Sequence, residues 1–139
     1  MPAIDFTNLR VFIDENVHQI YTDLTSGAAD RAEDAPFAKM PDLFVAAACY
    51  GANAGVFKPI EGKKRDIFVA DALNQTTQIP SLIALAYRRV GNLEELVNAK
   101  TILTVCEGWA NGGIHLLRDQ LYSGNGLRPL YRLVDGILR

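Results

Sequence analysis

Apolar residues near the N-terminus recur at intervals of three and four positions, which is the spacing of one face of an α-helix. The repeat consists of Leu9, Phe12, Ile13, Val17, Ile20, Tyr21 and Leu24. Thr7 stands just before it, and threonine is a common capping residue at a helix N-terminus. The pattern therefore predicts an amphipathic first helix from Leu9 to Leu24.

The next helical segment begins at Pro41 and is apolar on nearly every side. Proline is frequent in the first helical turn, and Asp42 places a negative charge near the positive end of the helix dipole. Small residues that allow close approach follow: Ala46, Ala47, Ala48 and Ala52. A helix that is apolar all round is normally covered on several sides, so we expect a central helix that Gly51 and Gly55 end.

The remaining patterns complete the prediction of elements. Residues 25–35 are small, polar and acidic, which indicates a flexible connector after the first helix. Further helical patterns cover Ala70 to Leu73, Pro80 to Val90, Leu93 to Ala110, Ile114 to Tyr122 and Leu127 to Leu138. Gly91 follows the second of these, as expected for a helix C-terminus.

The segment from Val56 to Phe68 has the weakest helical pattern and contains Pro59 and Gly62. The apolar residues at its two ends, Val56 with Phe57 and then residues 67–69, could pair as a short β-ribbon with basic residues at its tip. The same residues could instead anchor an irregular loop. Both alternatives stay open, and the loop is favoured.

Together these patterns predict a mainly α protein, a compact single helical domain over residues 1–139. It would be a bundle of about five to six helices, with one basic loop or short β-ribbon between Val56 and Phe68. The chain has 139 residues, 49% of them hydrophobic and 22% charged, which is typical of one globular domain. No apolar run approaches the roughly 20 residues of a membrane span, and the N-terminus does not resemble a signal peptide. We expect a cytoplasmic protein without membrane contact.

The chain's only tryptophan, Trp109, stands among three glycines within a helical pattern. Each glycine costs a helix roughly 1 kcal/mol relative to alanine, so three of them indicate either a close backbone crossing or a helix break. We predict that Trp109 lies in the core and that a packing motif surrounds it, composed of Glu107, Gly108, Trp109, Asn111, Gly112 and Gly113.

Candidate catalytic residues are few. Cys106, Glu107 and His115 include a nucleophile and a base, but Cys106 and His115 would be about 13 Å apart along an unbroken helix. Only a break at the glycines would bring them together. We therefore expect a buried Cys106, a Glu107 that is exposed or caps a helix, and a surface His115. A thiol hydrolase that uses Cys106 is a remote alternative.

Cys49 and Cys106 both lie in apolar helical patterns, which predicts two reduced, buried thiols. No histidine or cysteine pair has zinc-ligand spacing. The glycines Gly51 and Gly55 follow a helix rather than a strand, which is the wrong context for a dinucleotide site. We expect no metal and no cofactor.

The formal net charge of −2 conceals an acidic N-terminal region and one basic cluster. The cluster consists of Lys58, Lys63, Lys64 and Arg65. Short basic runs are common on solvated surfaces, and the sequence pI of about 5.6 is not that of a dedicated nucleic-acid binder. A functional interpretation is that these residues, with Arg88 and Arg89, contact DNA phosphates or an acidic partner.

Two stretches of the chain have a distinctive composition. The first is the alanine-rich helix from Pro41 to Gly51, followed by Gly55 and the basic proline loop from Lys58 to Ile60. The second is Glu107 to Leu117, with a Glu, an aromatic residue and Ala-Asn-x-Gly. Both resemble segments of the small helical proteins encoded beside bacterial DNA phosphorothioation (Dnd) systems, and the second is the stronger match. Here Trp109 stands where tyrosine is commoner, and the similarity covers residues 36–121.

The resemblance implies a non-enzymatic accessory protein in DNA modification or phage defence, and it supplies no catalytic residues. Its implied partner is a protein of a DNA-modification or restriction complex, on which the chain would act as an adaptor. The alternative is a weak DNA-binding regulatory module that uses the basic loop on the DNA backbone. The acidic chain favours the adaptor. The sequence does not determine whether the chain forms a homo-oligomer.

Overall fold

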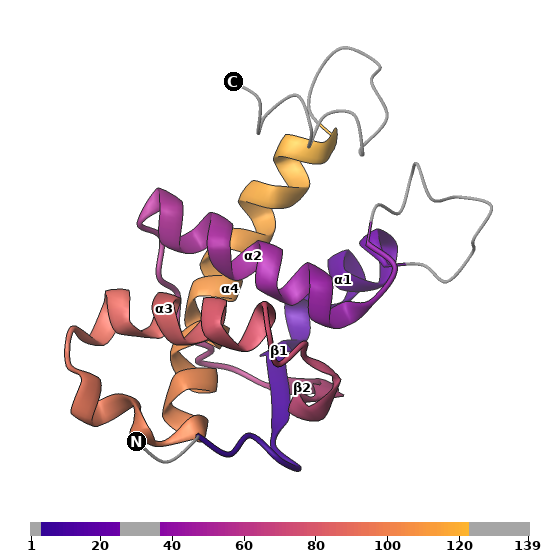
Figure 1. The fold of residues 1–139 in the computed structure, drawn as a ribbon. Coiled ribbons are helices and arrows are strands. Elements are labelled where there is room, and N and C mark those ends of the chain that lie inside the picture. The colour runs from indigo at the N-terminus through magenta and orange to yellow at the C-terminus, as the bar shows by residue number, and fades with distance from the viewer. Residues whose placement is uncertain (1–3, 26–36, 123–139) are drawn as a thin grey trace.

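The computed structural model describes residues 4–25 and 37–122, which contain four α-helices and a two-stranded antiparallel sheet (Figure 1). The elements are β1 (Arg10–Asp14), the 3₁₀ helix η1 (Glu15–Val17), α1 (His18–Leu24), α2 (Met40–Ala54), β2 (Lys64–Val69), η3 (Ala70–Ala72), α3 (Gln78–Val90), η4 (Leu93–Val97) and α4 (Ala99–Tyr122). The mainly helical class is confirmed, with four α-helices in the described residues rather than five to six. The predicted last helix from Leu127 to Leu138 and connector residues 26–35 lie outside them.

The centre of the molecule is the packing of α2 against α4, which cross in Figure 1 with α3 beside them. Leu43, Phe44 and Ala47 of α2 are fully buried, as are Ile102 and Ile114 of α4. The prediction of a central, covered second helix is therefore confirmed. α2 ends at Gly55, whose φ of 71° is a left-handed conformation that glycine adopts at little cost.

The first half of the predicted N-terminal helix is wrong. Residues Arg10–Asp14 form β1, in which Val11 and Ile13 are buried, and only η1 and α1 continue as helix. The buried positions alternate, which suits a strand, but their spacing also fits a helix when residues up to Leu24 are read together. Pairing with β2, which local sequence does not reveal, decides between the two.

β2 pairs with β1 in an antiparallel register that places Val11 opposite Phe68 and Phe12 opposite Asp66. The register shifts between Val11 and Phe12. The predicted β-ribbon alternative, in which residues 56–57 would pair with residues 67–69, is wrong. Residues 56–63 form the loop that the sequence favoured, while Lys64–Val69 is a strand whose partner lies near the N-terminus.

α4 runs from Ala99 to Tyr122 without a break, so the predicted interruption at Gly112 and Gly113 is wrong. The alternative prediction for these glycines, a close backbone crossing, is confirmed by their contacts with α2 and with the loop after it. The predicted helix from Leu93 to Ala110 is divided into η4 and α4. Asn92 caps η4 by accepting a hydrogen bond from the Glu94 amide.

α3 ends at Gly91, which has a φ of 72° and matches the predicted helix C-terminus. The short helix predicted at residues 70–73 is the 3₁₀ helix η3. Within the described ranges, no helix combines the length and apolar character that crossing a membrane requires.

Candidate functional site

The segment Glu107–Gly113 of α4 contacts four other parts of the fold: β1, α2, α3 and the loop after α2. Successive residues on a helix point about 100° apart, so seven residues cover its whole circumference. The segment is accordingly buried on every side. The contacts of its residues define what this part of the molecule can do.

Gly113 makes the closest approach to α2. A Cβ atom at this position would overlap the carbonyl oxygen of Ala47 and the amide nitrogen of Gly51. A Cβ atom at Gly51 would in turn overlap the carbonyl oxygen of Trp109. The two helices thus meet backbone against backbone, and only glycine fits at these positions.

The loop after α2 lies along α4 and is held by polar contacts to its backbone. The amide of Lys58 donates to the Gly108 carbonyl at 3.1 Å, and the Asn111 side-chain amide donates to the Lys58 carbonyl at 2.9 Å. A Cβ atom at Gly112 would overlap the carbonyl oxygen of Val56. Asn111 and Gly112 therefore fix the start of the predicted basic loop against α4.

Trp109 is 5% exposed, which confirms its predicted place in the core. Its indole N–H donates to the Leu85 carbonyl of α3 at 2.9 Å. Its ring meets Phe57 edge to face, with 5.1 Å between ring centroids. The Arg89 guanidinium lies over the Phe57 ring, 4.2 Å from its centroid, and Gly108 leaves room for this ring.

Glu107 belongs to the packing motif that the sequence predicted, but its burial beside a cavity was not predicted. The prediction that it is exposed or caps a helix is wrong, because its side chain is only 6% exposed. Its Oε2 accepts a hydrogen bond from the Phe12 amide of β1 at 3.0 Å. Burial raises the pKa of this carboxyl to about 7, and the Phe12 hydrogen bond and the charges of Lys64 and Lys100 oppose that rise. Near neutral pH it exists in both protonation states.

A cavity of about 430 Å³ opens over Glu107 between β1, the start of β2 and the first half of α4. The residues that line it are Asn8, Leu9, Arg10, Phe12, Lys64, Lys100, Leu103, Thr104 and Glu107. Its volume is within the range of small-molecule sites. A buried carboxyl with a displaced pKa in such a cavity is a common property of functional sites.

One signal in the sequence could have identified this side of α4. Lys100, Thr104, Glu107, Asn111 and His115 recur at intervals of three and four positions along α4. Such a spacing places polar side chains on one face. The signal was insufficient because the segment that covers this face, β1, was predicted as helix.

The catalytic hypothesis for Cys106 has no geometric support. Its thiol is buried and lies 3.2 Å from the Leu82 carbonyl, to which it donates, and burial raises its pKa. Because α4 is unbroken, His115 remains about 13 Å away along the helix. His115 is half-buried rather than on the surface, and burial lowers its pKa.

Cys106 is buried as predicted, whereas the prediction that Cys49 is buried is wrong. α2 is apolar in sequence on nearly every side, but its packing against α4 leaves one side exposed. Cys49 lies on that side. The exposed side of an alanine-rich helix is hard to recognise in the sequence, because alanine is tolerated both in the core and at the surface.

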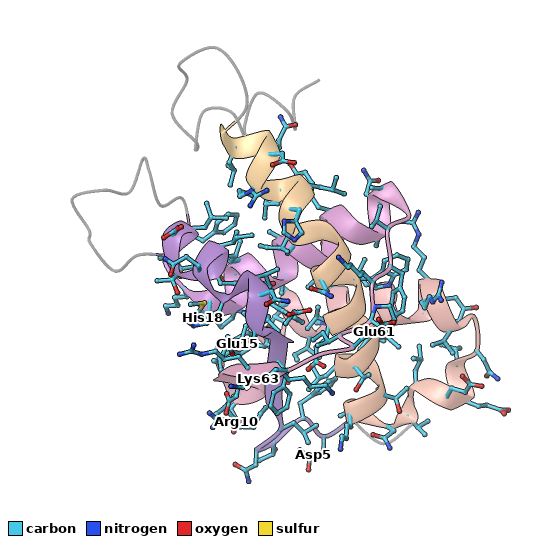
Figure 2. All side chains as sticks on the ribbon, turned by 180° about the vertical axis from the view of Figure 1, so that it is seen from behind. Asp5, Arg10, Glu15, His18, Glu61 and Lys63 are labelled. Carbon is cyan, nitrogen blue, oxygen red and sulfur yellow. The ribbon has the colours of Figure 1, made fainter. Side chains whose placement is uncertain are left out.

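The six predicted basic residues come from three different parts of the fold. Lys63 ends the loop, and Lys64 and Arg65 begin β2, where the Arg65 guanidinium is 3.3 Å from the Glu15 carboxylate. Figure 2 shows Arg10, Glu15 and Lys63 on the side of the molecule that carries the sheet, with Glu61 apart from them. The others are Lys58 at the loop start and Arg88 and Arg89 in the last turn of α3.

Comparison with known proteins adds no relative. No family model, curated protein or solved structure shows significant similarity to this chain.

Proposed function

We propose that this chain is a non-enzymatic accessory protein that docks on a protein partner of a bacterial DNA-modification or phage-defence system. The system is suggested by the resemblance of residues 36–121 to Dnd-associated proteins. The docking role is supported by one observation on the described surface, the exposure of large apolar side chains at η4. Leu93 is 60% exposed and Val97 is 65% exposed.

The η4 surface has the composition of a docking site. Tyr87, at the end of α3, is 44% exposed and precedes Leu93 and Val97 closely in the chain. Glu94 and Glu95 are exposed between those two residues. Apolar side chains beside carboxylates suit a partner surface that is apolar at its centre and basic around it. DNA-handling proteins commonly carry basic surfaces, so this complementarity fits the proposed system.

Co-purification tests the proposal directly. The chain is co-expressed with the modification and restriction proteins of a DNA phosphorothioation system, and we expect one of them to be retained at stoichiometric amounts. The double variant Leu93→Ser/Val97→Ser should weaken that complex at least tenfold, because it removes the apolar area of two side chains that would be buried against the partner. Surface changes of this kind alter folding stability by about 0.5 kcal/mol or less.

Leu116→Ser is the matched control, because Leu116 is an exposed leucine on α4 away from η4. It should leave the complex unchanged. If none of the co-expressed proteins is retained, the adaptor proposal is rejected. Equal retention by the wild type and the double variant would reject η4 as the docking surface.

The weak DNA-binding alternative receives less support from the structure. Arg65 is paired with Glu15, Arg89 lies on Phe57, and the basic residues are divided between β2, the loop and α3. If four of them neutralised phosphates, the logarithm of DNA affinity would fall with that of salt concentration at a slope of about −3 to −4. We expect a shallower slope, and a triple alanine variant of Lys63, Lys64 and Arg65 tests it.

A further inference from the structure

The cavity over Glu107 presents one carboxylate oxygen without a partner. Oε2 accepts the Phe12 amide, while among residues 4–25 and 37–122 no group donates a hydrogen bond to Oε1. Glu107 nonetheless lines the cavity. Among the described residues only the Tyr21 hydroxyl is both buried and unpartnered, so Oε1 keeps contact with solvent in the cavity. It is therefore a hydrogen-bond acceptor for whatever enters.

The cationic side chains of the same cavity differ in their state of pairing. Arg10 is neutralised by Asp66, with 2.7 Å between guanidinium and carboxylate. Lys64 and Lys100 line the cavity and are exposed, and within the described ranges neither forms an ion pair. Both lie close enough to Glu107 to affect its titration, yet neither approaches it within ion-pair distance. The cavity lining therefore includes two lysines that form no ion pair with the described residues.

The cavity also has an apolar part. Leu9, Phe12 and Leu103 contribute to its lining, and the Lys64 ammonium lies 5.9 Å from the Phe12 ring centroid. A flat apolar body can lie against such walls, with an anionic group toward the lysines and a donor group toward Glu107. A volume of about 430 Å³ accommodates a ligand of this size.

We propose that this cavity binds a guanine nucleotide, with the base on Glu107 and the phosphate at Lys64 and Lys100. Guanine carries two adjacent N–H donors, on its ring and its exocyclic amine, with no acceptor between them. The Glu107 carboxylate offers two acceptors, the unpartnered Oε1 and the second lone pair of Oε2, whose first lone pair accepts the Phe12 amide. Adenine and cytosine place a donor beside an acceptor, and uracil places its donor between two acceptors, so each leaves a repulsive contact. Lysine ammonium groups are common phosphate ligands. The proposal is independent of the docking function.

Calorimetric titration of the whole chain with guanosine 5′-monophosphate at low salt is the first test. We expect saturable binding at least tenfold tighter than that of adenosine 5′-monophosphate or inorganic phosphate, because a mismatched base leaves buried polar groups unpaired. No binding of guanosine 5′-monophosphate up to millimolar concentration rejects the proposal. Equal binding of inorganic phosphate reduces the site to an anion site and also overturns it.

Variants test which residue binds the base of the nucleotide and which binds its phosphate. Glu107→Gln keeps an acceptor for the Phe12 amide but loses the charge, and it should weaken the nucleotide at least tenfold while inorganic phosphate is unaffected. Lys100→Ala should weaken nucleotide and phosphate alike. Lys63→Ala is the control, since Lys63 adjoins Lys64 but does not line the cavity.

Unchanged nucleotide binding in both Glu107→Gln and Lys100→Ala overturns the assignment, and Lys100→Ala keeps the test available if the Glu107 variant does not fold. Leu93→Ser/Val97→Ser should bind nucleotide like the wild type. That result separates a failure of this site from a failure of the docking proposal.

Discussion

Gly113 and Glu107 lie less than about two turns apart on α4, yet they join it to the rest of the molecule in opposite ways. At Gly113 the backbones of two helices touch, and no space is left for a single methyl group. At Glu107 a carboxyl is buried beneath a cavity of about 430 Å³. The first arrangement serves packing. The second costs stability, since burial of a carboxylate is unfavourable unless it is fully paired. A costly buried group beside open space is what a binding site requires.

The largest effect is expected at the close crossing of α2 and α4 at Gly113. Gly113→Ala should lower the free energy of unfolding by about 3 kcal/mol or more, at or beyond the upper range for overpacking, because the obstructing atoms belong to the α2 backbone. Urea denaturation followed by the fluorescence of Trp109 measures it. Gly62→Ala is the control, because a Cβ there meets no atom within 4 Å. Equal stability of the two variants would contradict the crossing.

The second prediction tests the cost of burying the Glu107 carboxyl, through the pH dependence of stability. The folded-state pKa of Glu107 is raised to about 7, above its unfolded value near 4.3, so the folded state binds its proton more tightly. The free energy of unfolding should therefore fall by about 2–3 kcal/mol as pH rises from 4.5 to 7, and Glu107→Gln should lack this fall.

Subtracting the pH profile of Glu107→Gln from that of the wild type leaves the contribution of Glu107 to the free energy of unfolding. The lowered pKa of His115 acts oppositely, because stability from it is lost as pH decreases, but it is present in both proteins. Denaturation curves at several pH values supply the measurement. Parallel pH profiles for wild type and Glu107→Gln would show that the buried carboxyl carries no such cost.

A smaller effect is expected at Gly108, which lies between the two regions. A Cβ atom there would contact the Phe57 ring at 2.5 Å, and a side chain can rotate away where a backbone cannot. Gly108→Ala should cost about 1 kcal/mol, comparable with the loss of the Phe57 contact with Trp109. A shift in tryptophan emission with a modest change in stability would agree. A loss as large as that of Gly113→Ala would show that the loop is as rigid as α2.

The smallest effect is expected at Tyr21, whose buried polar group is uncharged, unlike that of Glu107. The hydroxyl of Tyr21 is fully buried and has no hydrogen-bond partner among the described residues. Tyr21→Phe should stabilise the protein by up to about 1 kcal/mol, because it removes an unsatisfied polar group. Thermal melts of the two proteins decide. A clear loss of stability would mean that this hydroxyl is paired in solution.

The helical parts of the fold that could be predicted are those whose pattern is local. α2 follows from its proline start, its alanines and Gly55, and the end of α3 follows from Gly91. The packing role of the glycines around Trp109 could be predicted from their helix cost, but not the choice between a crossing and a break. That choice depends on α2, which is distant in sequence.

The candidate site could not be predicted because it depends on contacts between distant segments. β1 fits both a helix and a strand pattern, and only its pairing with β2 makes it extended. Without β1 there is no partner for Glu107, and the cavity has no second wall. The basic residues were visible in sequence, but the ion pair of Arg65 with Glu15 was not, because it links residues 50 positions apart.

The bond between the Phe12 amide and Glu107 also has a consequence for the order of folding. It joins residues 95 positions apart, and the contact of Arg10 with Asp66 spans 56. Closing such long segments is entropically slow, whereas the contacts of α3 with η4 and α4 are nearly local. We expect α3 and α4 to associate early and β1 to add last, at a rate typical of mixed α/β domains. The cavity would then exist only once the chain has finished folding.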